Sequence, residues 1–280
     1  MDLILLLKAL VLGLVEGLTE FLPISSTGHL ILMGSLINFD GEESKVFDIV
    51  IQFGAILAIC WEYRKRIKQV VWSLATEQIT RRFVLNMIVA SMPAIIIGLL
   101  FEKSIKALLF SPVPVAIMLI VGGIILLWVE SAYRRRAFDM YRIRIQSIDE
   151  LTIIDSLKVG LAQCLALIPG TSRSGAAIVG GMLTNLERCV ATEFSFFLAI
   201  PLIFGATVYE LIGAYDILGA SDARLFTVGF IAAFASAFAC VRWLLHYIST
   251  HDFTLFAWYR IFFGLFVLVI SYCEGFKFNY

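Results

Sequence analysis

Long apolar segments separated by short charged ones recur along this chain. Six of them hold roughly 18 residues or more, which is enough to cross about 30 Å of hydrocarbon as a helix. They cover residues 46–63, 82–101, 112–130, 190–212, 225–246 and 255–273. The pattern therefore predicts an all-α polytopic membrane protein with six transmembrane helices.

Two further apolar regions are interrupted in the middle. One runs from residue 2 to 37 and is broken at Pro23, and the other runs from 153 to 185 and is broken at Pro169-Gly170. Their halves are mostly too short to span a bilayer, so we expect two re-entrant helical hairpins. Non-helical backbone at membrane depth is tolerated only inside protein or beside water, so the breaks also predict a cavity.

The chain is similar to itself in two places. GLVEGLTEFLPISS at 13–26 is similar to GLAQCLALIPGTS at 160–172, and QFGAILAI at 52–59 is similar to EFSFFLAI at 193–200. The two similarities occur in the same order, which favours a duplication. Each copy would hold one hairpin and three spans, and because three is odd the copies form an inverted-topology repeat.

This duplication predicts one membrane domain over residues 1–280. Repeat one would cover about 1–130 and repeat two about 153–274, joined by a basic loop at about 131–152. Most lysines and arginines between spans, including the run at 64–68, fall on one side, which should be cytoplasmic. The first hairpin would then enter from outside and the second from the cytoplasm, with their tips meeting near the midplane.

Composition agrees with a membrane protein. Hydrophobic residues make up 60% of the 280 residues and charged residues 16%, against roughly 45–50% and 25% in soluble domains. The formal net charge is zero, so we expect no nucleic-acid partner. The five cysteines show no CxxC spacing and are expected to be packing residues. The start, MDLILLLKAL, lacks the features of a signal peptide.

The first break carries an unusual polar cluster, EGLTEFLPISSTGH at 16–29. Glu16 and Glu20 are four residues apart, so a helix places both carboxylates on one face. At membrane depth such groups are costly unless they are protonated, paired or bound to a cation. We expect them to hold a divalent cation, Mg²⁺ or Ca²⁺, and the alternative is a shared proton or a hydrogen bond to a neighbouring helix.

Three hydroxyl residues, Ser25, Ser26 and Thr27, then stand where a helix should begin. A helix N-terminus with free N–H groups is a ready anion site, although ordinary capping would also use a hydroxyl. His29 follows within one turn, so its ring can lie beside Ser25 or Ser26. Hydroxyl plus imidazole is the pairing of a nucleophile with its base.

The second break, IPGTSRSG at 168–175, repeats the arrangement with Gly170, Ser172 and Ser174. Arg173 is the important addition, because the planar guanidinium suits phosphate and needs an anionic partner at membrane depth. A plain ion pair with Glu16 or Glu20 is the alternative. Together the two tips have the groups that phosphoryl transfer needs, and no Walker A lysine is present.

At this point the chain resembles a known family. EGLTEFLPISSTGHL at 16–30 and LIPGTSRSGAAIVGGML at 167–183 look like the two signature segments of the undecaprenyl-diphosphate phosphatase, or bacitracin-resistance, family. The resemblance covers essentially the whole chain. It implies an integral inner-membrane enzyme that removes one phosphate from undecaprenyl diphosphate and so recycles the lipid carrier for peptidoglycan synthesis. One departure is Ala177, where the family motif has threonine.

The resemblance also implies roles for the residues at the tips. The family's E/Q-x-x-x-E motif falls on Glu16 and Glu20, the expected cation ligands. Ser26 is the expected nucleophile, His29 its base and Arg173 the phosphate clamp; Ser25, His29 or water could attack instead. The groups expected to hydrogen-bond the substrate are Ser25, Thr27, Gly170, Ser172 and Ser174.

Partners and location follow from the same reading. We expect a polyprenyl diphosphate lipid as substrate, the bilayer as surroundings and a cavity that opens toward the periplasmic face. A second copy of the chain, in a homodimer, is the further partner that we consider. Inverted repeats with broken helices are also a transporter architecture, so a polyprenyl-phosphate flippase is the alternative function.

Overall fold

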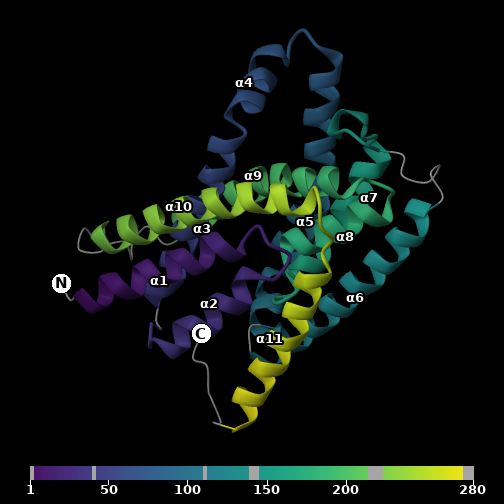
Figure 1. Ribbon diagram of the computed structural model, residues 1–280. Helices are drawn as coiled ribbons and strands as arrows, with labels where there is room; N and C mark the ends of the chain where they lie inside the picture. Colours follow the sequence, from purple (N-terminus) through teal and green to yellow (C-terminus); the bar gives the residue numbers. More distant parts are fainter. Residues whose placement is uncertain (1–2, 40–41, 110–111, 139–144, 214–222, 274–280) are drawn as a thin grey trace.

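The computed structural model describes residues 3–39, 42–109, 112–138, 145–213 and 223–273 (Figure 1). Within these ranges the regular structure is helical, apart from an isolated bridge between Ile145 and Leu186. The prediction of an all-α protein is therefore confirmed. The elements are α1 Leu3–Thr19, α2 Ser26–Leu36, α3 Glu42–Glu62, α4 Arg64–Ser73, α5 Gln78–Leu109, α6 Pro112–Phe138, η1 Ile148–Glu150, α7 Ile153–Gln163, η2 Cys164–Leu167, α8 Arg173–Leu183, α9 Arg188–Gly213, α10 Ala223–Ile248 and α11 Thr254–Cys273.

Five of the described helices contain segments long and apolar enough to cross a membrane. These segments are Gln78–Phe101, Pro112–Arg135, Arg188–Gly213, Ala223–Ile248 and Thr254–Tyr272. No more than 39% of the most apolar stretch of each is buried inside the protein, so most of their apolar surface faces outward. Apolar surface of this extent requires lipid around it, and the chain is an integral membrane protein.

The predicted span at 46–63 lies in α3. Together, α3 and α4 make a sixth candidate for a membrane span, but the axes of the two helices differ by 73° at the break at Tyr63. In Figure 1 α4 points away from the helices that surround α1 and α10. The structure therefore has five or six spans among the described residues. Some of the basic residues that set the predicted orientation, Arg142, Arg144 and Lys277, lie outside the described residues.

Both predicted breaks are present. The chain leaves α1 after Thr19 and re-forms a helix at Ser26, and it leaves η2 after Leu167 and re-forms a helix at Arg173. Proline explains the interruption, because it lacks an N–H and disfavours helix at the residue before it. At the second break Gly170 has φ +89°, and a side chain there would also collide with the backbone of Val115.

Small residues let the broken helices approach their neighbours closely. On α1, a Cβ added to Gly13 or Gly17 would meet backbone atoms of α10, so this GxxxG pair lets the two backbones touch. On α7, a Cβ at Gly160 would meet the backbone of Ala90 in α5. The broken helix of each predicted repeat thus packs against a helix of the other repeat, α1 on α10 and α7 on α5. This reciprocal packing is what a duplication would produce. The inverted topology itself stays a prediction.

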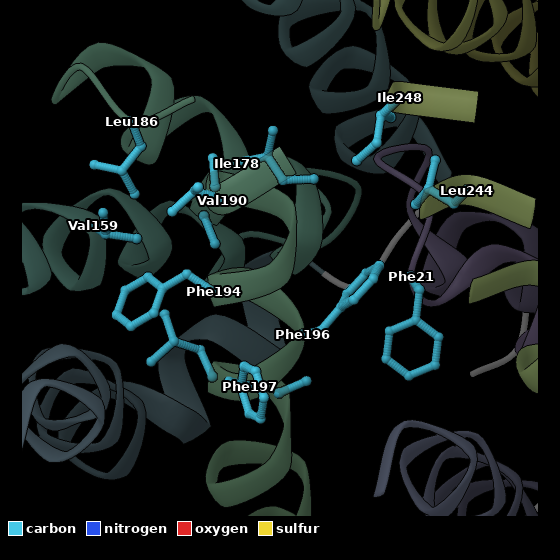
Figure 2. Packing of buried hydrophobic residues seen from close by; sticks show 14 of the residues in the cluster. Phe21, Val159, Ile178, Leu186, Val190, Phe194, Phe196, Phe197, Leu244 and Ile248 are labelled. Atoms are coloured by element: carbon cyan, nitrogen blue, oxygen red, sulfur yellow. The ribbon is translucent and has the colours of Figure 1, made fainter. Parts of the chain in front are cut away.

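The largest buried apolar cluster of the described residues includes Phe21 and Ile24 of the first break. Figure 2 shows side chains of this cluster from α7, α8, α9 and α10, with Phe196 directed toward Phe21. The rings of Phe21 and Phe196 meet edge to face with centroids 5.6 Å apart. Because Phe21 follows Glu20 in the break, this packing holds the non-helical segment in a fixed place.

Candidate active site

The shortest side-chain contact at the first tip joins Ser26 to Glu20. The Ser26 Oγ donates to Glu20 Oε2 at 2.6 Å, and both residues are buried. The helix break brings them together, since Glu20 lies just beyond α1 and Ser26 is the first residue of α2. A short hydrogen bond from a hydroxyl to a carboxylate is the contact that prepares a serine for proton loss.

Arg173 binds the other oxygen of the same carboxylate. Its Nε lies 3.4 Å from Glu20 Oε1, and its Nη1 donates to the carbonyl of Ser195 in α9 at 3.0 Å. Its Nη2 is buried and has no hydrogen-bond partner among the described residues. The ion pair that the sequence left as an alternative is thus formed, and one face of the fork is still available to an anion.

Glu16 is fully buried on the last turn of α1. Neither carboxylate oxygen has a hydrogen-bond partner in the described part of the chain. Glu20, Asp48 and Arg173 are the charged groups that act on it. A buried carboxylate without a partner is expensive, so Glu16 fits a site for a cation or another ligand.

The carboxylates alone do not complete a metal site. Among the described residues no group of three or more His, Cys, Asp or Glu side chains is placed to hold a metal ion. Mg²⁺ is commonly bound by one or two carboxylates, with substrate phosphates and water filling the remaining positions. Glu16 and Glu20 fit that second arrangement and not an all-protein cage.

His29 is held by α11 and not by Ser26. Its Nδ1 lies 2.7 Å from the carbonyl of Ser25, which can only accept, so Nδ1 carries a proton. Its Nε2 lies 2.8 Å from the hydroxyl of Tyr259, and its ring stacks on Phe263 with centroids 4.1 Å apart. The expected hydrogen bond between His29 and Ser26 is therefore not formed, because Tyr259 and Phe263 fix the ring elsewhere.

The serines of the second tip fasten the two tips together. The Ser174 hydroxyl donates to the carbonyl of Leu22 at 2.8 Å, and the Ser172 hydroxyl, 3.0 Å from that of Ser174, in turn accepts from the N–H of Gly175. Both hydroxyls thus have structural partners here, and their role in substrate binding stays a prediction. The carbonyl of Gly170 is also engaged, by Arg260.

Of the remaining predicted residues, Ser25 and Thr27 flank Ser26 at the start of α2. Ser25 is buried, adopts φ 72° and makes no side-chain hydrogen bond as the helix cap. Thr27 is half-buried one residue into the helix. Both therefore lie beside the Ser26–Glu20 pair, and their contacts with substrate stay predictions.

Several residues at the site were not predicted from the sequence. Asp48 and Arg260 had a readable signal, since each is a charged residue inside an apolar span, and such residues are usually functional. Tyr259 precedes Arg260 and had no signal of its own. Thr171 and Ser195 are also polar groups near Arg173, and their buried hydroxyls have no partner in the described residues.

The fold and the site define an integral membrane protein in which two broken helices bring a hydroxyl, carboxylates and a guanidinium together inside the protein. The family model described as "Bacitracin resistance protein BacA" matches residues 9–266. The chain belongs to this family.

Curated relatives are similar over nearly the whole length. "Undecaprenyl-diphosphatase 1" of Paraburkholderia xenovorans (strain LB400) is 62% identical over 272 residues, which is 97% of this chain and 97% of the relative. "Undecaprenyl-diphosphatase 1" of Burkholderia thailandensis (strain ATCC 700388 / DSM 13276 / CCUG 48851 / CIP 106301 / E264) is also 62% identical, over 97% of this chain and 98% of the relative.

Proposed function

We propose that this protein hydrolyses undecaprenyl diphosphate to undecaprenyl phosphate and inorganic phosphate. The relatives named for this activity match nearly the whole chain. The observation that carries the proposal is the Ser26–Glu20–Arg173 group, in which a hydroxyl and a guanidinium bind the two oxygens of one carboxylate, the proposed base. This recycling of the lipid carrier would also account for bacitracin resistance, the phenotype that names the family.

The first chemical step is phosphoryl transfer to Ser26. Glu20 accepts the hydroxyl proton through the 2.6 Å hydrogen bond while Oγ forms a bond to the terminal phosphorus. The bond from that phosphorus to the bridging oxygen breaks, and undecaprenyl phosphate leaves with the electron pair. Arg173 neutralises charge on the transferred group through its Nη2, which has no partner among the described residues.

In the second step water attacks the phosphoserine. Glu20, now protonated, returns its proton to the serine oxygen as the bond from phosphorus to that oxygen breaks. The water oxygen and its protons leave with the phosphorus as inorganic phosphate. Ser25, His29 and direct attack by water stay alternatives for the nucleophile. The base is assigned to Glu20 in place of His29, since the imidazole is engaged by Ser25 and Tyr259.

A divalent cation, Mg²⁺ or Ca²⁺, completes the proposal. Glu16 and Glu20 would hold it. This assignment is supported by the Glu16 oxygens, which have no hydrogen-bond partner in the part of the chain that the structure describes. When bound, the cation supplies charge neutralisation for the diphosphate. The lipid substrate would enter from the bilayer, with its prenyl tail remaining among the apolar helix faces.

A flippase is not favoured. Transport alone does not need a hydroxyl hydrogen-bonded to a carboxylate that also holds an arginine. Detergent-purified protein separates the two functions, because detergent abolishes transport across a bilayer but not hydrolysis. We expect phosphate release from undecaprenyl diphosphate that stops on chelation and returns with Mg²⁺ or Ca²⁺. No release from well-folded protein under either cation would reject the proposed activity.

The orientation is also proposed: an inner-membrane protein whose site opens to the periplasm. Ion pairs at one end of the bundle, Arg66–Asp149, Arg188–Glu130 and Arg242–Glu62, support a common basic end that would be cytoplasmic. In a cysteine-free background, an impermeant thiol reagent should label Arg224→Cys but not Arg135→Cys in intact cells. The opposite labelling would invert this orientation.

A further inference from the structure

Arg260 is the one arginine of the apolar helix α11, and it is buried in the first half of that helix. Only 2% of it is exposed, and no acidic side chain in the described part of the chain lies within ion-pair distance. A charge in such a place is costly and is kept only where it performs a function that neutral residues cannot. Arg260 does not belong to either sequence motif at the tips.

The guanidinium is bound by backbone carbonyls from three separate elements. Its Nη1 donates to Pro23 at 3.1 Å, in the first break. Its Nη2 reaches Thr171 at 2.8 Å and Gly170 at 3.1 Å, in the second break. The remaining contacts are to the carbonyls of Met118 at 3.2 Å and Leu119 at 3.3 Å, both in α6.

These carbonyls explain why an arginine is needed. A break in a helix at membrane depth leaves carbonyl oxygens without intrahelical donors, and no water in the hydrocarbon can satisfy them. The guanidinium offers five N–H groups in a rigid fork, so one side chain can satisfy carbonyls of both breaks at once. A lysine has three donors on one atom and cannot span the same separation.

The neighbouring helix is shaped to receive this side chain. A Cβ added to Gly122 would collide with Nη2 of Arg260, and one added to Gly123 would lie 3.3 Å from its Cβ. On the other side, a Cβ at Gly175 would lie 3.1 Å from Nη1. Gly122 and Gly175 thus leave the space that the guanidinium occupies, and Gly123 lets α11 approach α6 closely.

We propose that Arg260 is a positioning residue that sets the distance between the two tips. It does not touch the reacting groups. It fixes Pro23, three residues from Ser26, against Thr171, two residues from Arg173. The nucleophile and the phosphate clamp are therefore held in register by one side chain. This inference rests on the proposed phosphatase activity.

The test uses the full-length protein in detergent with undecaprenyl diphosphate as substrate. Arg260→Lys keeps the charge but loses the fork. A displacement of about 1 Å between reacting groups can cost about 10²-fold, so we expect kcat to fall by about that factor while KM changes less than about threefold. Size-exclusion chromatography and thermal unfolding give the folded fraction, and kcat is expressed per folded molecule.

Gly122→Ala provides a second route to the same effect without changing the arginine. It should displace the guanidinium and lower kcat similarly, and the double variant with Arg260→Lys should be no worse than the more damaging single variant. Gly205→Ala is the matched control, since a Cβ there meets nothing within 4 Å. Because Gly122→Ala leaves Arg260 in place, it keeps the test usable if Arg260→Lys fails to fold.

The outcomes separate this inference from the proposed function. Wild-type protein without phosphatase activity would reject the proposed function itself. Active wild type together with folded Arg260→Lys or Gly122→Ala variants of normal kcat would reject only the positioning role. A loss of kcat that merely follows the loss of folded protein, or additive effects in the double variant, would also reject it.

Discussion

The two tips have the same backbone conformation before their second helix but differ in the side-chain hydrogen bonds that hold them. Ser25 and Ser172 precede helices of 11 residues, and their φ angles are 72° and 73°. Ser172 caps its helix through the N–H of Gly175, whereas Ser25 makes no side-chain cap. A non-glycine residue at positive φ is strained, so the same uncommon conformation in both places is a feature that the surrounding structure maintains.

The tips also differ in what they leave free. At the second tip, the hydroxyls of Ser172 and Ser174 are used to bind Gly175 and Leu22. At the first tip, the Ser26 hydroxyl points at Glu20, and the Glu16 carboxylate has no partner among the described residues. In the proposed mechanism the second tip thus acts as a fixed frame that presents Arg173, and the first tip holds the groups that react.

The largest effect is expected from a change of Glu20 at the first tip. Glu20→Gln keeps the shape of the side chain but cannot take the proton of Ser26, so we expect kcat to fall by about 10³-fold, within the usual range for a lost general base. The control is Glu62→Gln, a carboxylate paired with the exposed Arg242. Phosphate release from the purified variants measures both. If Glu20→Gln keeps more than about a tenth of the wild-type rate, another group must act as the base. The proposed contrast between the two tips would then be wrong.

The sequence predicted the helices and breaks well, for physical reasons. Lipid forces every spanning segment to be long and apolar. Proline disfavours a helix interior, and the two breaks contain Pro23 and Pro169-Gly170. Helices α5 and α9, however, continue through Pro93 and Pro201.

The bend at Tyr63 was not predicted, because no proline or glycine marks it. The sequence predicted that the span at 46–63 ends in a charged connector near residues 63–69. That prediction of a loop was wrong, because residues Arg64–Ser73 form helix α4.

At the site, residue types were predictable and pairings were not. Acidic, hydroxyl and guanidinium groups at membrane depth indicated Glu20, Ser26 and Arg173 directly. The partner of His29 lies 230 residues away, at Tyr259, and that contact depends on how α11 packs. Sequence proximity favoured His29 as the partner of Ser26. The helix break instead brings Glu20 to Ser26, and packing against α11 holds His29 at Tyr259.

The next largest effect is expected from a change of Arg173 at the second tip. Arg173→Lys keeps the positive charge but loses the second donor group, so we expect kcat/KM to fall by about 10²–10³-fold. Arg188→Lys is the matched control, since Arg188 also begins a helix and binds a carboxylate, Glu130, through Nε and Nη2. That variant should lose stability but keep its turnover per folded molecule. Equal losses of turnover in both variants would show that Arg173 only holds the fold together.

A smaller effect concerns how α11 supports the first tip. Tyr259→Phe removes the hydroxyl that binds Nε2 of His29 but leaves the stacked ring. One hydrogen bond is worth about 0.5–1.5 kcal/mol, so we expect kcat to fall by about threefold to tenfold. Tyr272→Phe, at a residue that is 91% exposed, should have no effect. A loss as large as that of Glu20→Gln would mean that His29 takes part directly in proton transfer.

The smallest expected effect compares the two caps themselves. Ser172→Ala removes the acceptor for the Gly175 N–H and the donor to Ser174, and loss of such a cap costs about 0.5–2 kcal/mol. Ser25→Ala removes no cap, so its effect on unfolding should stay within about 0.5 kcal/mol. Both variants keep a Cβ at positive φ, so backbone strain is the same before and after each change. Unfolding of the purified proteins by sodium dodecyl sulfate, followed by circular dichroism, compares the midpoints. If the two midpoints shift equally, the tips are fastened alike, and the second tip is not the more rigid of the two.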